Sequence, residues 1–353
     1  MERLPEFFHE VRQRSQLDLE HEFVLAFLAL AGEPAVADSR RHMLSYSASC
    51  AITMVASHCA RFGRRVGLIE PVFDNISSIL MREGVMLTPL RESEFAARGA
   101  AEAVAASECE VVWLVSPNNP TGWTLSESEF GAIVADCAAR GRLLVLDTSF
   151  RFFHRELQPW SMYEMLETSG VSYVVLEDTG KTWSTNEIKV GLVICSQDMY
   201  PEMFRLHDDL LQAVSPLHLR MLIEFIQDSR DRGRAATVLR YVTENRAILR
   251  AELAGTPLTF LTGPDSPVSV DWLRIDADFD AEDLYRALAE EGVHILAGGN
   301  FYWSTPSLGD RLVRIALSRD PADVRLGAEV LRATAFRLAQ TAERPLLGAV
   351  AVE

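Results

Sequence analysis

Short apolar runs and helical spacings of apolar residues alternate along roughly the first 200 residues of the chain. Five of these runs have the length of buried strands and therefore predict strands. They are Val66–Ile69, Val111–Val115, Leu143–Leu146, Val171–Leu176 and Gly191–Cys195. Between them the spacing predicts helices such as Ala51–Arg61 and Glu127–Arg140, the second preceded by a capping-box signature in Ser126 and Glu129. Strands that alternate with helices predict an α/β fold, with helices on both faces of a mainly parallel central sheet.

Helical patterns flank this region, and a second group of strands follows it. Residues 1–34 and 200–255 predict helices, whereas Pro267–Ile275 and Leu312–Leu317 predict strands of a smaller α+β lobe. We expect a helix near residues 225–250 to join the two lobes, and the tail after Pro345 to be loosely held. The predicted domains are an N-terminal helical segment (1–34), a large domain (35–245) and a small C-terminal domain (246–353).

The composition narrows the class of protein. The 353 residues carry a net charge of −16 and no basic block, which argues against nucleic-acid binding. No apolar run has the length of a membrane span, and the N-terminus lacks the apolar core of a signal peptide. The five cysteines have no Cys-x-x-Cys spacing, and the eight histidines show no metal-ligand pattern. We therefore expect a cytoplasmic protein with reduced thiols and no metal.

Three polar residues each follow a different predicted strand: Asn119, Asp147 and Lys181. Ligands of open α/β sheets bind at the carboxyl ends of the strands, where these residues would meet. An amine, an acid and an amide suit pyridoxal 5'-phosphate (PLP), whose aldehyde forms a Schiff base with lysine and whose ring nitrogen pairs with a carboxylate. Lys181 would also move protons at the substrate α-carbon, and Asn119 would donate to the phenolic oxygen. Taken singly, an exposed lysine, a strand-end aspartate and an Asn-Pro-Thr-Gly turn are the simpler interpretations.

Four residues are candidates for binding the cofactor phosphate. Ser47, Ala48 and Ser49 precede a predicted helix, whose N-terminus offers free N–H groups and positive dipole to an anion. A plain N-cap is the commoner role of such serines. Lys189, eight residues after Lys181, would be a second cation on the phosphate.

Two further side chains are candidates for contacts with the ring and with the substrate. Phe73 follows the run Val66–Ile69 and would stack on the pyridine face, although a core position is the alternative. Arg314 interrupts the apolar run Leu312–Leu317, where a guanidinium is costly unless it is paired. A substrate α-carboxylate would pair with it in bidentate fashion, and an internal acid is the alternative partner.

The Asn-Pro-Thr-Gly turn, Asp147, Lys181 and the late Arg314 resemble, in their order, the fold type I PLP-dependent enzymes of the aminotransferase class I/II superfamily. The resemblance covers about residues 40–320. It implies the transferase fold of that superfamily, PLP as the cofactor, and a homodimer with its active sites at the interface.

Two stretches depart from ordinary aminotransferases. The usual Asp-x-Ala-Tyr is Asp147-Thr148-Ser149-Phe150, so Ser149 would replace the tyrosine hydroxyl on the phenolic oxygen. The usual Ser-x-Ser-Lys, followed by an arginine, is Asp178-Thr179-Gly180-Lys181, followed by Lys189. Both departures resemble the oxygen-using, PLP-dependent L-arginine oxidases and hydroxylases of antibiotic pathways such as enduracididine biosynthesis. The similar stretches are Pro71–Ile76, Leu146–Arg151, Glu177–Lys181, Val214–Leu217 and Val313–Arg319.

This narrower resemblance implies that Asp178 binds a substrate guanidinium and that Trp303 lies near the site. Members of the group carry a longer N-terminal segment that covers the active site. This chain is expected to begin after most of that segment, with Met1–Arg14 as a short replacement.

Four functions are open at this point. The first is an oxidase or hydroxylase of an arginine-like cationic amino acid, which yields a 2-oxo acid with dioxygen as the oxidant. The second is an aminotransferase that uses the same residues and a 2-oxo acid acceptor. The third is a cyclase or lyase acting on a modified arginine. The fourth is a non-catalytic binding protein with this fold, which the complete set of candidate residues and the absence of a basic module disfavour.

Overall fold

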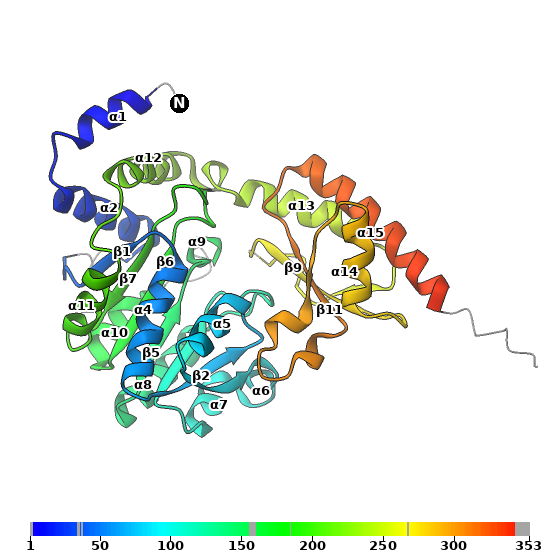
Figure 1. Cartoon of the computed structure of the whole chain (residues 1–353), viewed down its shortest axis with the longest axis horizontal. Coiled ribbons are helices and arrows are strands. Elements are labelled where there is room, and N and C mark those ends of the chain that lie inside the picture. The colour runs from blue at the N-terminus through cyan, green and yellow to red at the C-terminus, as the bar shows by residue number, and fades with distance from the viewer. Residues whose placement is uncertain are drawn as a thin grey trace, which may run out of the picture. The chain divides into compact units, whose positions relative to one another are not determined.

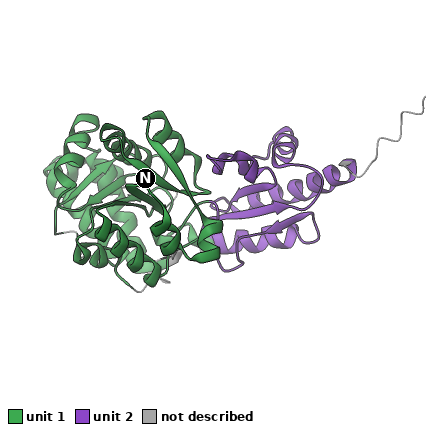
Figure 2. Cartoon of the chain, turned by 90° about the horizontal axis from the view of Figure 1, so that it is seen from below, with its two compact units in different colours: residues 1–119, 123–240 green, residues 120–122, 241–353 purple. Residues whose placement is uncertain are grey.

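The computed structural model describes residues 3–342, apart from 34, 35, 37, 155–159, 184 and 267. The chain forms two compact units, residues 1–119 with 123–240 (unit 1) and residues 120–122 with 241–353 (unit 2) (Figure 2). It passes from unit 1 to unit 2 between Arg240 and Tyr241, within helix α13 (Leu239–Glu252). The expected boundary at residues 245 and 246 lies in the same helix. The tail after Pro345 and the first residue of the expected strand 267–275 lie outside the described residues.

Unit 1 is built on a seven-stranded sheet with the order β1-β7-β6-β5-β4-β2-β3 (Figure 1). Its strands are β1 (His42–Ser45), β2 (Arg65–Glu70), β3 (Met86–Arg91), β4 (Val111–Val115), β5 (Leu143–Asp147), β6 (Tyr173–Asp178) and β7 (Gly191–Cys195). The pairs β2–β3, β2–β4, β4–β5 and β5–β6 are parallel, and β7 runs antiparallel to both β6 and β1. The predicted mainly parallel sheet is therefore confirmed.

Helices surround this sheet, and their burial explains the continuous apolar runs of its central strands. Every residue of β4, β5, β6 and β7 is buried, as expected for strands covered on both faces. The helices of unit 1 are α1 (Leu4–Val11), α2 (Gln16–Ala31), α4 (Ala48–Arg61), α5 (Asp74–Arg82), α6 (Glu92–Arg98), α7 (Ala100–Ala106), α8 (Glu127–Arg140), α9 (Arg151–His154), α10 (Met162–Ser169), α11 (Tyr200–Leu210), α12 (Pro216–Arg232) and the 3₁₀ helix η2 (Gly233–Ala236). In the described part of the chain, no helix is both long and apolar enough to cross a membrane.

The two strands of this sheet that the sequence analysis does not predict, β1 and β3, lie at its two edges. Strand β3 contains Pro89, which has no N–H group and is tolerated at an edge, and most of its residues are partly exposed. Strand β1 has four residues and pairs with β7 on one side. Both strands therefore lack the long, fully apolar pattern of a central strand.

Unit 2 contains a four-stranded antiparallel sheet with the order β10-β11-β9-β8. Its elements are α13 (Leu239–Glu252), β8 (Leu258–Phe260), β9 (Val270–Ile275), α14 (Ala281–Glu290), β10 (Leu296–Ala297), η3 (Gly298–Phe301), η4 (Pro306–Gly309), β11 (Leu312–Ala316) and α15 (Pro321–Ala342). Arg246 of α13 pairs with Asp271 of β9 at 3.0 Å, and both side chains are buried. With these helices and strands, unit 2 has the predicted α+β composition.

Candidate active site

The carboxyl ends of β5 and β6 bring two candidate acids together. Asp147 ends β5 and pairs in register with Leu176 of β6, two residues before Asp178. Alternate side chains of a strand point to opposite faces, so Asp147 and Asp178 share one face of the sheet and Glu177 lies on the other. Helix α4 begins on the shared face, since the N–H of Ala48 donates to Asp178 Oδ2 at 3.3 Å.

Asp178 holds the loop that carries Lys181. Its Oδ1 accepts the N–H of Gly180 at 2.5 Å, while its Oδ2 accepts that of Ala48. The carboxylate therefore ties the turn before Lys181 to the N-terminus of α4. A carboxylate offers about four acceptor positions, so these two bonds leave capacity for a substrate donor.

A second set of hydrogen bonds, between Thr179 and Val190, fixes the same loop. The N–H and hydroxyl of Thr179 both donate to the carbonyl of Val190 at 3.1 Å, and its hydroxyl accepts the N–H of Val190 at 2.8 Å. Lys181 follows this anchored segment and is exposed. The backbone before Lys181 is therefore anchored by hydrogen bonds, and Lys181 itself is exposed to solvent.

Gly180 is explained by close packing. A Cβ atom at this position would lie 3.0 Å from Cβ of Lys189 and 3.1 Å from Oδ1 of Asp178. The chain therefore has Gly where ordinary aminotransferases have Ser, because Lys189 and Asp178 both pack against residue 180. Sequence reasoning identified this departure but not its cause, which depends on a contact with a residue nine positions further along the chain.

Asp147 is the most perturbed acid of the site. Burial raises its pKa from 3.8 to about 6, and the charges of Asp178 and Glu177 act in the same direction. Two hydrogen bonds from Ser149 oppose this shift, because its N–H and hydroxyl donate to Asp147 Oδ1 at 2.9 and 2.6 Å. The Ser149 hydroxyl has a single proton, which it donates to Asp147. To donate to the phenolic oxygen as predicted, Ser149 would have to give up this hydrogen bond.

Each of the three residues at the start of α4 has a hydrogen-bond partner within the protein. The Ser47 hydroxyl accepts the N–H of Cys50 at 3.3 Å and is the N-cap of the helix. The Ser49 hydroxyl accepts from Nδ2 of Asn75 at 2.6 Å, and the N–H of Ala48 is bonded to Asp178 as described. The role of these residues in binding phosphate remains a prediction that rests on the helix N-terminus.

The loops after β4 and β2 carry the remaining candidates of unit 1. Asn119 is buried, and its Oδ1 has no hydrogen-bond partner among the described residues. The neighbouring Asn118 donates to the carbonyl of Pro71 at 2.8 Å, which joins the two loops. Phe73, in the second loop, is half-buried at the start of α5.

Arg314 and Trp303 belong to unit 2. Arg314 lies on β11, 5.9 Å from the ring centroid of Phe301, and lines a cavity of about 290 Å³. Trp303 follows η3 and is half-buried. Their predicted contacts with substrate stay predictions.

The residues of unit 1 fit PLP. Asp147 is a buried carboxylate whose ionised form needs a nearby cation, which a protonated ring nitrogen supplies. Asn119 lies after the adjacent strand β4, and only its amide oxygen, an acceptor, lacks a partner among the described residues, so donation by Nδ2 to the phenolic oxygen stays a prediction. Lys181 is accessible for a Schiff base, and Lys189 is close to the same loop. This donor set, an amine with a separate acid for a ring nitrogen, matches the chemistry of the cofactor.

Comparison with known proteins gives one family. The family model described as aminotransferase class I and II matches residues 8–331. The solved structure of MppP soaked with the product 2-ketoarginine superposes with a TM-score of 0.87 and 34% identity. That match covers 94% of this chain and 93% of MppP.

Curated relatives are more distant. The histidinol-phosphate aminotransferase of Chlorobium limicola is 21% identical over 248 residues, which are 67% of this chain and 62% of that protein. The threonine-phosphate decarboxylase of a Sinorhizobium species is 26% identical over 269 residues, which are 76% of this chain and 70% of that protein. The chain therefore spans less than two thirds of the length of the first of these relatives.

Replacing Asp147 by Asn is expected to stabilise the cofactor-free protein at neutral pH. The raised pKa means that the folded state binds a proton more tightly than the unfolded state. The cost of ionisation is absent below about pH 4 and complete above about pH 6, where it reaches about 3 kcal/mol. Thermal unfolding of both proteins from pH 4 to 8 should show an advantage of D147N that grows with pH.

With PLP bound, the order should reverse, because the wild-type carboxylate gains the ring cation and the amide does not. Equal stability of the two cofactor-free proteins at pH 7 would show that Asp147 carries no uncompensated buried charge.

Asp178→Ala is expected to lower stability by about 2 kcal/mol or more, since two backbone N–H groups lose their acceptor. It should also weaken PLP binding, because the Lys181 loop is no longer tied to α4. Asp198→Ala is the control, since Asp198 follows β7 and its carboxylate accepts from the hydroxyl of Ser172, the residue before β6. An unchanged PLP dissociation constant in D178A would contradict the linking role.

Proposed function

Because the chain belongs to the aminotransferase class I and II family, whose cofactor is PLP, we propose that it acts on the α-amino group of an arginine-like cationic L-amino acid. The proposed reaction is an oxidation or hydroxylation with dioxygen that gives a 2-oxo acid, in specialised metabolism such as antibiotic biosynthesis. The observation that carries the proposal is the similarity to MppP, which extends over nearly the whole of both chains. The product in that structure, 2-ketoarginine, is the 2-oxo acid of arginine.

The charge distribution of the site supports a cationic substrate. Asp178 is buried, and its hydrogen-bond partners within the described residues are the backbone N–H groups of Ala48 and Gly180. A buried carboxylate is costly unless it is paired or well hydrogen-bonded. A substrate guanidinium would add a charge-assisted, bidentate partner at its remaining acceptor positions.

Each candidate residue has a distinct task in this proposal. The bound cofactor supplies an electron-withdrawing ring that makes the substrate α-proton acidic. Lys181 removes and returns that proton at the α-carbon, and Asp147 holds the proton on the ring nitrogen by charge pairing. Asn119 donates to the phenolic oxygen, and Arg314 holds the α-carboxylate.

The oxidase reaction balances with dioxygen and water as the only co-reactants. The amino acid loses two electrons and its amino group, and becomes a 2-oxo acid and ammonium. Dioxygen takes the two electrons and becomes hydrogen peroxide, while water supplies the oxo oxygen. Hydroxylation also adds a hydroxyl group to the substrate carbon chain, which is a further two-electron oxidation: a second dioxygen becomes hydrogen peroxide and a second water supplies the hydroxyl oxygen.

An aminotransferase is the second candidate. It is favoured by the curated histidinol-phosphate aminotransferases among the relatives, although their identity to this chain is low. In that reaction the amino group passes to a 2-oxo acid acceptor and no dioxygen is consumed. The threonine-phosphate decarboxylase shows that related sequences also support a different outcome.

The deciding experiment is reaction of the PLP-loaded protein with L-arginine and a panel of other amino acids, without any 2-oxo acid, with and without air. Oxygen uptake with continued formation of a 2-oxo product from arginine is the expected result. A single half-turnover without oxygen uptake, restarted by adding a 2-oxo acid, would overturn it in favour of the aminotransferase. Absorbance and product masses report both outcomes.

We also propose that the protein is a cytoplasmic homodimer, as its family resemblance implies. Light scattering of the purified, PLP-loaded protein should give twice the mass of the chain, which is 39.4 kDa. A stable species of single-chain mass at micromolar concentration would contradict the dimer.

A further inference from the structure

A buried charged network lies behind the ends of β5 and β6. Nε of Arg151 is 2.9 and 3.1 Å from the two carboxylate oxygens of Glu177, and Nη2 is 2.8 Å from Oε1. The hydroxyl of Tyr163 donates to Glu177 at 3.1 Å, and Glu33 lies 3.4 Å from Nη1 of Arg151. All four residues are 5% exposed or less.

Glu33 extends the network to two helices. It follows the end of α2, and its Oε1 accepts the N–H of Met162, the first residue of α10, at 2.9 Å. Ser161, the N-cap of α10, also donates to Glu33. The guanidinium of Arg151 thus connects the end of α2, the start of α10 and the end of β6.

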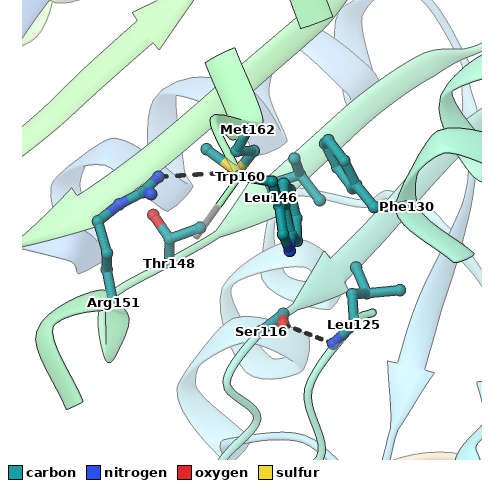
Figure 3. A pocket seen from close by; sticks show the side chains of 8 residues that line it. All are labelled: Ser116, Leu125, Phe130, Leu146, Thr148, Arg151, Trp160 and Met162. Carbon is teal, nitrogen blue, oxygen red and sulfur yellow. Dashed lines mark hydrogen bonds between the residues drawn. The ribbon is translucent and has the colours of Figure 1, made fainter. Parts of the chain in front are cut away.

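The network lies on the face of the sheet opposite the candidate acids. Glu177 alternates with Asp178 on β6 and therefore points away from it. Arg151 points toward Met162 of α10, with Nη2 3.6 Å from the sulfur (Figure 3). A cavity of about 10 Å³ beside it is lined by Phe130 of α8 among others, and has no room for a substrate. Arg151 is therefore connected to the candidate active site only indirectly, through neighbouring residues.

The backbone links Arg151 to both catalytic strand ends. Arg151 follows Asp147 by four residues, and its N–H donates to the carbonyl of Thr148 at 2.8 Å. Thr148 N–H in turn donates to the carbonyl of Leu176 at 2.8 Å. Glu177 directly precedes Asp178. A bidentate pair between Arg151 and Glu177 therefore fixes the end of β5 against the end of β6.

We propose that Arg151 is a positioning residue for the proposed reaction: its pairing with Glu177 and Glu33 holds Asp147 and the Lys181 loop in register for the cofactor. The pair flanks the two stretches, 147–150 and 178–181, in which this chain departs from ordinary aminotransferases, since Arg151 follows the first and Glu177 precedes the second. Removing one member of the pair alone would leave a buried charge without its partner.

The charges of the network support this role. Burial alone would lower the pKa of Arg151, but the charge of Glu177 and its hydrogen bond raise it above the ordinary value. The groups that act on Asp147 are Ser149, Asp178 and Glu177. Arg151 pairs with the last of these, so its loss would change the charge that Glu177 presents to Asp147.

The test compares Arg151→Met with Arg41→Met. Arg41 precedes β1 and pairs with Glu167 at 2.6 Å while donating to the carbonyl of Cys195, at the opposite end of the sheet. Both variants should lower the melting temperature of the cofactor-free protein. R151M alone should raise the PLP dissociation constant at least tenfold and shift the pH midpoint of the absorbance of lysine-bound PLP. Arg151→Lys, which keeps the charge, should recover part of both effects.

A normal dissociation constant and pH midpoint in R151M, despite a lowered melting temperature, would reduce Arg151 to a structural role and overturn the inference. If R151M does not fold, Glu177→Gln gives the same readouts with a smaller change in volume. The inference rests on the proposed function only through PLP binding. Failure of the wild-type protein to bind PLP would refute that function, whereas normal binding by R151M refutes the inference alone.

Discussion

The cost of keeping a carboxylate ionised at the buried end of β5 governs the arrangement of this site. Asp147 is 4% exposed, and burial is the largest cause of its raised pKa. The protein compensates only in part, through the two hydrogen bonds from Ser149. A protonated ring nitrogen of the bound cofactor would supply the remaining compensation.

The neighbouring strand shows how the chain concentrates negative charge without losing its fold. Glu177 and Asp178 are adjacent, yet their side chains lie on opposite faces of β6 and have different partners. On one face Glu177 has Arg151, a full positive charge held in bidentate geometry. On the other face, the partners of Asp178 within the described residues are backbone N–H dipoles. The fold therefore neutralises the structural acid internally and leaves the acid on the cofactor face available to a cationic ligand.

The sequence predicts the central part of the fold well, because buried strands there are continuous apolar runs. The bounds of β4, β7 and α8 agree with the predicted ranges, and the capping box of Ser126 and Glu129 is present. The edge strands β1 and β3 could not be predicted, since their residues are partly polar and β3 contains a proline. The order of the strands depends on pairing between distant segments, which apolar patterns do not encode.

The site is predicted less completely, for a related reason. Residue type and position after a strand indicate Lys181 and Asp147, because the carboxyl ends of parallel strands must meet. Neither signal shows that Asp178 accepts from the start of α4, or that Lys189 packs against Gly180. These contacts join residues that are 130 and nine positions apart, and only the folded chain brings them together.

The geometry that makes the α-proton of a bound amino acid acidic does not decide what happens afterwards. The tasks proposed for Lys181, Asp147 and Arg314 would be the same in an oxidase and in an aminotransferase, so their presence cannot separate the two. A feature that distinguishes the two reactions has to act after the α-proton has been removed. It would either admit dioxygen or return the proton to an atom other than the α-carbon. In the proposed function Asp178 would act earlier, on the choice of substrate. These residues therefore bear more directly on which amino acids would be bound than on which products would be formed.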